Sequence, residues 1–125
     1  MYLGIEKDTR ILDLQKEFNH LYPFLKLEFF RHPASQNKIL QKAEKINPLE
    51  PIRSLSRNHE PGKIDIGPQT TVAQLVDNFR KVFRLSVLVF RKSGNLWIET
   101  SLTDNWTLDK QNTIGETFSS SHGTL

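Results

Sequence analysis

The stretch at residues 66–90 reads IGPQTTVAQLVDNFRKVFRLSVLVF, and its apolar pattern repeats that of residues 5–30, IEKDTRILDLQKEFNHLYPFLKLEFF. The aligned apolar pairs in the middle of the two stretches are Ile11 with Val72, Leu14 with Leu75, and Phe18 with Phe79. In each copy the apolar residues first recur at helical spacing and then follow the pattern of a strand. Each copy therefore predicts a strand, a helix and a second strand.

Capping residues indicate where the two helices begin. Thr71-Val-Ala-Gln74 matches the capping box, in which each side chain bonds the backbone N–H of the other residue. In the first copy, Asp8 or Thr9 is expected to cap the helix, and Pro23 cannot continue it.

The segments around the two copies predict further elements. Residues 85–90 are apolar at odd and even positions alike, which is typical of a central strand. Ser93-Gly-Asn95 predicts a tight hairpin that returns through residues 95–100. Between the copies, we expect a connecting helix at about residues 36–46 and a short strand at residues 52–57.

The predicted fold is a single α+β domain over residues 1–116, built from repeat units at about residues 2–31 and 63–91. Two such units can interleave as a split β-α-β, ferredoxin-like sandwich with one mixed sheet, which the C-terminal hairpin strand would extend. Residues 117–125 contain too little apolar surface to offset ordering and are expected to be a disordered tail.

Residues 52–112 also support an alternative fold. The segment Gly67-Pro-Gln-Thr-Thr-Val-Ala-Gln-Leu resembles the strand-to-helix entry of the ubiquitin-like β-grasp, and Trp106-Thr-Leu-Asp-Lys-Gln-Asn resembles its late turn. This resemblance implies a β-grasp second half, with a strand pair at residues 52–57 and 63–67, and an N-terminal β-α-β extension. It implies no functional residues.

A second resemblance rests on Phe90-Arg-Lys-Ser-Gly-Asn-Leu-Trp and Thr103-Asp-Asn-Trp-Thr-Leu-Asp-Lys-Gln-Asn. Both segments are similar to segments of small uncharacterised bacterial proteins to which no activity is assigned. The resemblance implies a bacterial setting and no mechanism.

Composition limits the classes of function. The 125-residue chain has no cysteine, which excludes disulfides, thiolate metal sites and cysteine nucleophiles. Neither a signal peptide nor a run of about 18 apolar residues is present, so we expect a cytoplasmic protein without a membrane span. The net charge is +3, but residues 51–92 carry eight Lys or Arg against three Asp or Glu. A basic segment of this kind can attract phosphate or an acidic partner.

No catalytic or cofactor motif is found. The sequence contains no Gly-rich phosphate loop and no G-x-S-x-G elbow. None of the four histidines lies three or four residues from another. Glu99, Asp104 and Asp109 surround two tryptophans, but turn formation and helix capping explain them more simply. We expect a non-enzymatic binding module without metal or cofactor.

Three kinds of binding remain open. A protein partner or a second copy could pair with a sheet edge, either the first strand or residues 95–100. Single-stranded nucleic acid could stack on strand aromatics and contact nearby cations. A small-ligand sensor is the third alternative. The residues expected on a binding surface are Arg91, Lys92, Trp97 and Trp106.

Overall fold

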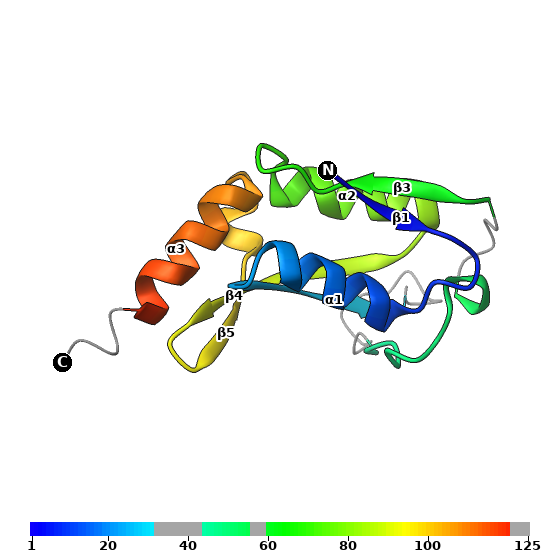
Figure 1. Ribbon diagram of the computed structural model, residues 1–125, viewed down its shortest axis with the longest axis horizontal. Coiled ribbons are helices and arrows are strands. Elements are labelled where there is room, and N and C mark those ends of the chain that lie inside the picture. The colour runs from blue at the N-terminus through cyan, green and yellow to red at the C-terminus, as the bar shows by residue number, and fades with distance from the viewer. Residues whose placement is uncertain (32–43, 56–59, 121–125) are drawn as a thin grey trace.

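Each repeat forms a strand, a helix and a strand in the computed structural model, which describes residues 1–31, 44–55 and 60–120 (Figure 1). The elements of the first copy are β1 (Tyr2–Ile5), α1 (Ile11–Leu21) and β2 (Leu25–Phe30). Those of the second copy are β3 (Gly62–Asp65), α2 (Val72–Phe83) and β4 (Ser86–Ser93). The chain continues through β5 (Leu96–Glu99) and α3 (Leu108–Ser120), so the predicted α+β class is confirmed.

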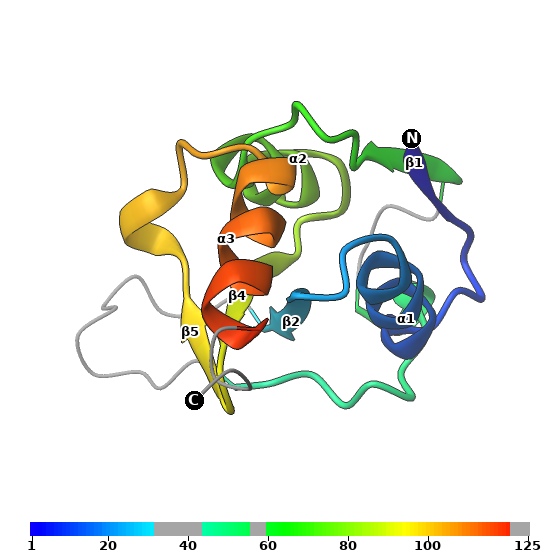
Figure 2. The ribbon, with the colours of Figure 1, turned by 60° about the vertical axis from the view of Figure 1, so that its left-hand side comes forward.

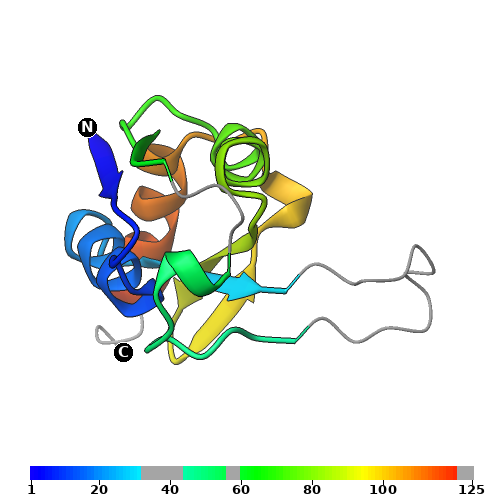
Figure 3. The ribbon, with the colours of Figure 1, turned by 90° about the vertical axis from the view of Figure 1, so that its right-hand side faces the viewer.

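The strands of the described residues form two antiparallel sheets, and the prediction of one mixed sheet is wrong. β1 pairs with β3, and the second sheet has the order β2-β4-β5. Corresponding strands of the two copies therefore pair with each other. α1 contacts β1 and β2, and α2 contacts β3 and β4, so each helix connects the two sheets (Figures 1 and 3). The two strands of one copy thus lie in different sheets, and the helix between them packs against both.

The β-grasp alternative is not formed by the described residues either. Ile52–Ser54 is a short 3₁₀ turn that follows Pro51, where a strand was expected. β3 pairs with β1 and not with this segment. The expected hairpin at the start of the second half is therefore missing from this part of the chain.

Both copies contribute to one hydrophobic core. Leu14 and Phe18 of α1 and Leu75 and Phe79 of α2 are fully buried in the same cluster. The ring of Phe79 lies 5.3 Å from that of Phe29 on β2, in an edge-to-face arrangement that favours aromatic pairs. The aligned apolar positions of the repeat are thus the positions that pack together.

The start of α2 is as predicted, and the start of α1 is not. The Gln74 N–H donates to the Thr71 hydroxyl at 3.1 Å, and the Thr71 N–H donates to the Gln74 side-chain oxygen at 2.9 Å. At α1 the N-cap is Arg10, whose N–H donates to the Asp13 carboxylate at 2.9 Å. Thr9 instead accepts the N–H of Glu6 within the preceding turn.

The C-terminal helix extends into the segment that was expected to be disordered. α3 runs from Leu108 to Ser120, so residues 117–120 are helical although the sequence predicted a disordered tail from residue 117. Gly115 allows α3 to approach β4 closely, and this packing stabilises a segment with weak helical propensity (Figure 2). Residues 121–125 lie outside the described residues.

Most of the predicted connecting helix at residues 36–46 also lies outside the described residues. Its last three positions, residues 44–46, are not helical. They run beside β2, where Lys45 forms a bridge with Phe30. The prediction is therefore wrong for the end of this segment.

β4 is the central strand of its sheet, as its apolar sequence predicted. Val87 and Val89 are buried on the face that α2 covers, while Leu88 and Phe90 are half-buried on the opposite face. The second face is therefore only partly covered. The predicted hairpin is confirmed, and Gly94 adopts a φ of 62° at the first position of its turn.

Candidate interaction surface

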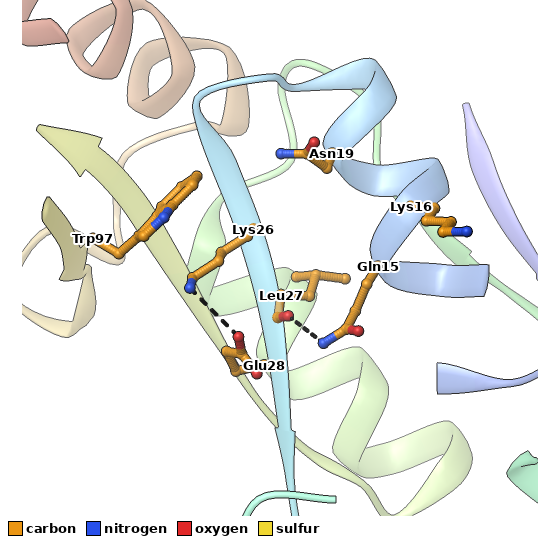
Figure 4. A pocket seen from close by; sticks show the side chains of 7 residues that line it. All are labelled: Gln15, Lys16, Asn19, Lys26, Leu27, Glu28 and Trp97. Carbon is orange, nitrogen blue, oxygen red and sulfur yellow. Dashed lines mark hydrogen bonds and ion pairs between the residues drawn. The ribbon is translucent and has the colours of Figure 1, made fainter. Parts of the chain in front are cut away.

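The two edges of the three-stranded sheet differ in how their backbone groups are satisfied. At the β2 edge, the side-chain amides of Asn19 and Gln15 on α1 donate to the carbonyls of Leu25 and Leu27 at 2.8 and 2.9 Å. Figure 4 shows Gln15 reaching from α1 to the β2 strand. The helix thereby occupies the edge where another strand would otherwise bind.

The covering of the β2 edge continues beyond α1. The Ile46 N–H donates to the Phe29 carbonyl at 2.9 Å, and the Arg31 N–H donates to the Glu44 carbonyl at 3.0 Å. Four backbone groups along this edge are therefore bonded within the chain. Sequence reasoning missed Gln15 and Asn19. Their only signal is that both amides lie four residues apart beside the apolar stripe of the helix.

The β5 edge is open. Lys92 is directly opposite Trp97, and the Lys92 N–H points away from β5 toward the Phe24 carbonyl, at 2.9 Å. In an antiparallel ladder, the backbone N–H and C=O groups of two opposed residues either bond each other or both point away from the partner strand. The N–H and C=O groups of Trp97 and Glu99 therefore point outward, and they have no backbone partner among the described residues.

Apolar side chains are exposed along this open edge. All four residues of β5 are exposed, with exposed fractions of 69% for Leu96, 37% for Trp97 and 42% for Ile98. Leu102, just after the strand, is 99% exposed. Unused backbone groups and exposed apolar side chains together are the features of a surface that binds another chain.

Trp97 covers part of the outer face of the sheet. The Lys26 ammonium lies 4.8 Å from the centre of the Trp97 ring and 5.6 Å from that of Phe90. Lys26 also pairs with Glu28 at 3.5 Å (Figure 4). Lys26, Glu28 and Trp97, with side chains of α1, line a shallow depression of about 290 Å³. Trp97 therefore acts as a cover on one side while its backbone stays open at the edge.

The structure divides the four residues expected on a binding surface between two faces. Lys92 and Trp97 are cross-strand neighbours on the outer face. Arg91 points to the other face, toward α3, where its guanidinium carbon lies 5.5 Å from the centre of the Trp106 ring. Lys110 stacks on the same ring at 4.2 Å. The four residues therefore do not form one continuous surface.

Arg91 is part of an internal polar network. Its guanidinium donates to the Gln111 side-chain oxygen at 2.8 Å, and the Gln111 amide donates to the Thr103 carbonyl and hydroxyl at 2.8 and 2.9 Å. Gln111 is fully buried. This network joins β4, the turn after β5 and α3, which gives Arg91 a structural role.

A groove of about 230 Å³ lies between α2 and β4 beside the end of β5. Glu99 and Asp104 line it, as does Asp77, whose carboxylate is paired with Lys81 and Arg80 at 2.7 and 2.8 Å. The hydrogen bond with Lys81 contributes most and that with Arg80 next, and together they hold the pKa of the Asp77 carboxylate below its ordinary value. Of the acids that the sequence singled out, Glu99 and Asp104 thus share one groove.

Asp109 does not line that groove. It lies at the start of α3, and its charge acts on Tyr22. Burial raises the pKa of the Tyr22 hydroxyl to about 12, with further contributions from Asp109 and Asp65. The hydroxyl donates to the Ile66 carbonyl at 2.7 Å, so Tyr22 is a structural residue that joins α1 to the end of β3.

The described residues contain no group of three or more His, Asp or Glu placed to hold a metal ion. Of the histidines, only His20 lies in the described part of the chain, and it is exposed. None of the helices in that part is both long and apolar enough to cross a membrane. Comparison of the chain with protein-family models, curated proteins and solved structures gave no match.

Proposed function

We propose that this chain is a binding module that recruits another protein chain by strand addition at the β5 edge. The observation that carries the proposal is the contrast between the two edges of one sheet. Side chains and backbone cover the β2 edge, whereas the outward groups of Trp97 and Glu99 have no backbone partner among the described residues. A strand that binds there would satisfy these groups and cover the apolar side chains beside them.

The sequence of β5 supports this role. Exposed edge strands are commonly protected by lysine, proline or a bulge, which prevent unwanted pairing. β5 reads Leu-Trp-Ile-Glu, and its pairing with β4 is regular from Leu96 to Glu99. It has neither lysine nor proline. Its one charged residue, Glu99, is the last of the strand, so Leu96 to Ile98 form an apolar stretch of edge that a partner strand would cover.

The other edge that the sequence suggested has a weaker apolar surface. Among the strands of the described residues, β1 pairs only with β3. Of its residues, Tyr2 is exposed and Gly4 has no side chain. Lys63 stacks on the Tyr2 ring at 4.4 Å. This strand offers backbone groups with one aromatic ring, whereas β5 offers three apolar side chains in a row. We therefore assign the partner to β5.

Nucleic-acid binding has less support from the geometry. A stacking platform needs aromatic and cationic side chains on one continuous surface. Arg91 and Trp106 lie on one face of the sheet, Lys92 and Trp97 on the other. The carboxylate of Glu28 also lies on the outer face beside Lys26. We therefore do not propose nucleic acid as the partner, and the experiment below includes a nuclease treatment that would detect it.

Two substitutions at one residue test the proposal. Glu99→Pro removes the outward N–H of Glu99, and proline is tolerated on an edge strand at such a position. Glu99→Gln keeps this N–H and removes only the charge, so it is the matched control. The tagged full chain and both variants would be isolated from the cells in which the protein occurs, with bound proteins quantified by mass spectrometry. Circular dichroism would verify that each variant is folded.

We expect proteins that bind the wild type and Glu99→Gln to be depleted about fivefold with Glu99→Pro, since one lost hydrogen bond is worth about 1 kcal/mol. Equal recovery with Glu99→Pro and wild type would overturn the proposal. So would loss of the bound proteins from the wild type after nuclease treatment, because that result assigns the binding to nucleic acid.

A further inference from the structure

We propose that the strand added to β5 is β5 of a second copy, with the two Trp97 residues directly opposite each other across a twofold axis. This inference rests on the proposed function, because it uses the same open edge. It adds the identity of the partner and the register of pairing. The two three-stranded sheets would join into one continuous antiparallel sheet.

Strand geometry limits the registers that a symmetric pair can adopt. We consider a twofold axis perpendicular to the sheet. Opposed residues of an antiparallel pair lie on the same face of the sheet, so in every symmetric register one residue lies opposite the same residue of the second copy. The axis passes between these two. Two registers then keep most of β5 paired, with the axis at Trp97 or at Ile98, and an axis at Glu99 pairs less of the strand.

Side-chain chemistry selects the register centred on Trp97. It places Leu96 opposite Ile98 of the second copy, and Ile98 opposite Leu96, so that four exposed aliphatic side chains meet on one face. The two indoles meet on the other face. Cross-strand aromatic and aliphatic pairs both stabilise an antiparallel ladder. The apolar residues of β5 are therefore complementary to themselves.

The same register keeps the negative charges apart. Glu99 would lie opposite Asn95 of the second copy, whose amide can donate to the carboxylate. Centring the axis on Glu99 would place two carboxylates opposite each other, and directly opposed like charges destabilise a ladder. Centring it on Ile98 would place each indole opposite a carboxylate. Charge and apolar matching thus agree on Trp97.

The chain after β5 leaves this edge accessible. The Thr100 N–H and hydroxyl both donate to the Val89 carbonyl, at 3.2 and 2.8 Å. The Ala73 N–H donates to the Asp104 carbonyl at 2.8 Å. The chain therefore turns back over β4 toward α2 once β5 ends, and not outward across the path of a second strand.

Single-cysteine variants test both the partner and the register, and the natural chain has no cysteine to interfere. In the proposed ladder the two Trp97 residues form a hydrogen-bonded pair. Leu96 of one copy and Ile98 of the other therefore form a non-hydrogen-bonded pair, with α-carbons about 4.5 Å apart. A disulfide can form at that separation. An equimolar mixture of Leu96→Cys and a tagged Ile98→Cys chain would be oxidised with oxidised glutathione.

We expect the mixture to give the cross-linked heterodimer at a level at least about tenfold above that of either variant alone. Leu102→Cys is the matched control, because Leu102 is 99% exposed but lies beyond the strand. Dominant cross-linking of Ile98→Cys with itself would overturn the Trp97 register. Cross-linking no greater than with Leu102→Cys would overturn the second copy as partner.

The failure of this inference can be distinguished from failure of the proposed function. If the cysteine mixture does not cross-link but Glu99→Pro still loses its bound proteins, the edge binds a different protein and only the second copy is overturned. If Glu99→Pro also retains all of its bound proteins, both proposals are overturned.

Discussion

Gly115 shows how one residue determines the position of α3. A β-carbon added there would lie 2.8 Å from the β-carbon of Phe24, 3.1 Å from the γ-carbon of Arg91 and 3.2 Å from the Lys92 carbonyl oxygen. Two of these atoms are in or next to the backbone and cannot move aside cheaply. Only glycine lets the helix approach β4 at this point.

Gly115→Ala should therefore lower the free energy of unfolding by about 1–3 kcal/mol, the usual cost of overpacking, despite the better helix propensity of alanine. Urea denaturation of the variant and the wild type would measure the change. Glu116→Ala, at the exposed neighbouring position, is the control and should change stability by less than about 0.5 kcal/mol. Equal stability of Gly115→Ala and wild type would show that α3 does not pack as described.

The structural role of Tyr22 can be tested through the pH dependence of the free energy of unfolding. Its hydroxyl is neutral in the fold, and burial raises its pKa to about 12, whereas the value in the unfolded chain is about 10. A pKa raised by folding gives stability that is complete below pH 10 and is lost as the pH rises through 12.

Tyr22→Phe should lower stability at pH 7 by about 1 kcal/mol, because the Ile66 carbonyl loses its donor. Between pH 10 and 12 the variant should lose less stability than the wild type, since it has no phenol to ionise there. Chemical denaturation at pH 8, 10 and 11 would measure both effects. Parallel losses in the two proteins would show that Tyr22 does not titrate as described.

At the scale of elements, α1 has a second task besides filling the core. The amides of Gln15 and Asn19 occupy two carbonyls of the β2 edge. Lys16 lies between them in sequence and has no hydrogen bond or ion pair in the described part of the chain. One side of the helix thus protects an edge strand.

Replacing both Gln15 and Asn19 by alanine should lower the free energy of unfolding by about 1–3 kcal/mol, because two carbonyls lose their donors. The variant should also aggregate faster, since a second edge becomes open to pairing. Thermal denaturation and light scattering would measure the two effects, with Lys16→Ala as the control. Stability and scattering unchanged in the double variant would refute the protective role.

The elements that the sequence predicted well are those with local signals. Apolar spacing and the Thr71–Gln74 box predicted α2, and the Gly94 turn predicted the hairpin, because these features depend on neighbours within a few residues. The separation into two sheets depends on which strands meet across the helices, and no local pattern carries that information. Residues 117–120 were expected to be disordered because they contain little apolar surface, whereas they continue a helix that packs on β4 through Gly115.

The candidate site was only partly predictable for a similar reason. The sequence indicated the strand at residues 95–100 as an edge and Trp97 as a possible surface residue. The alternation of side chains along a strand already separates the adjacent residues Arg91 and Lys92. The sequence could not show that Arg91 joins an internal network while Lys92 borders the outer face. Nor could it show which edge α1 covers, because that contact is between distant segments.

At the scale of the whole molecule, we propose that the chain recognises a partner through the outward backbone groups of β5. Hydrogen exchange of individual amides would test this, measured by NMR in the free protein and in the complex formed by the wild type. The Trp97 and Glu99 amides should exchange rapidly in the free protein and at least about tenfold more slowly in the complex. The Ile98 amide faces β4 and should be protected in both states. Rapid exchange at Trp97 and Glu99 in the complex, equal to that in the free protein, would contradict strand addition at this edge.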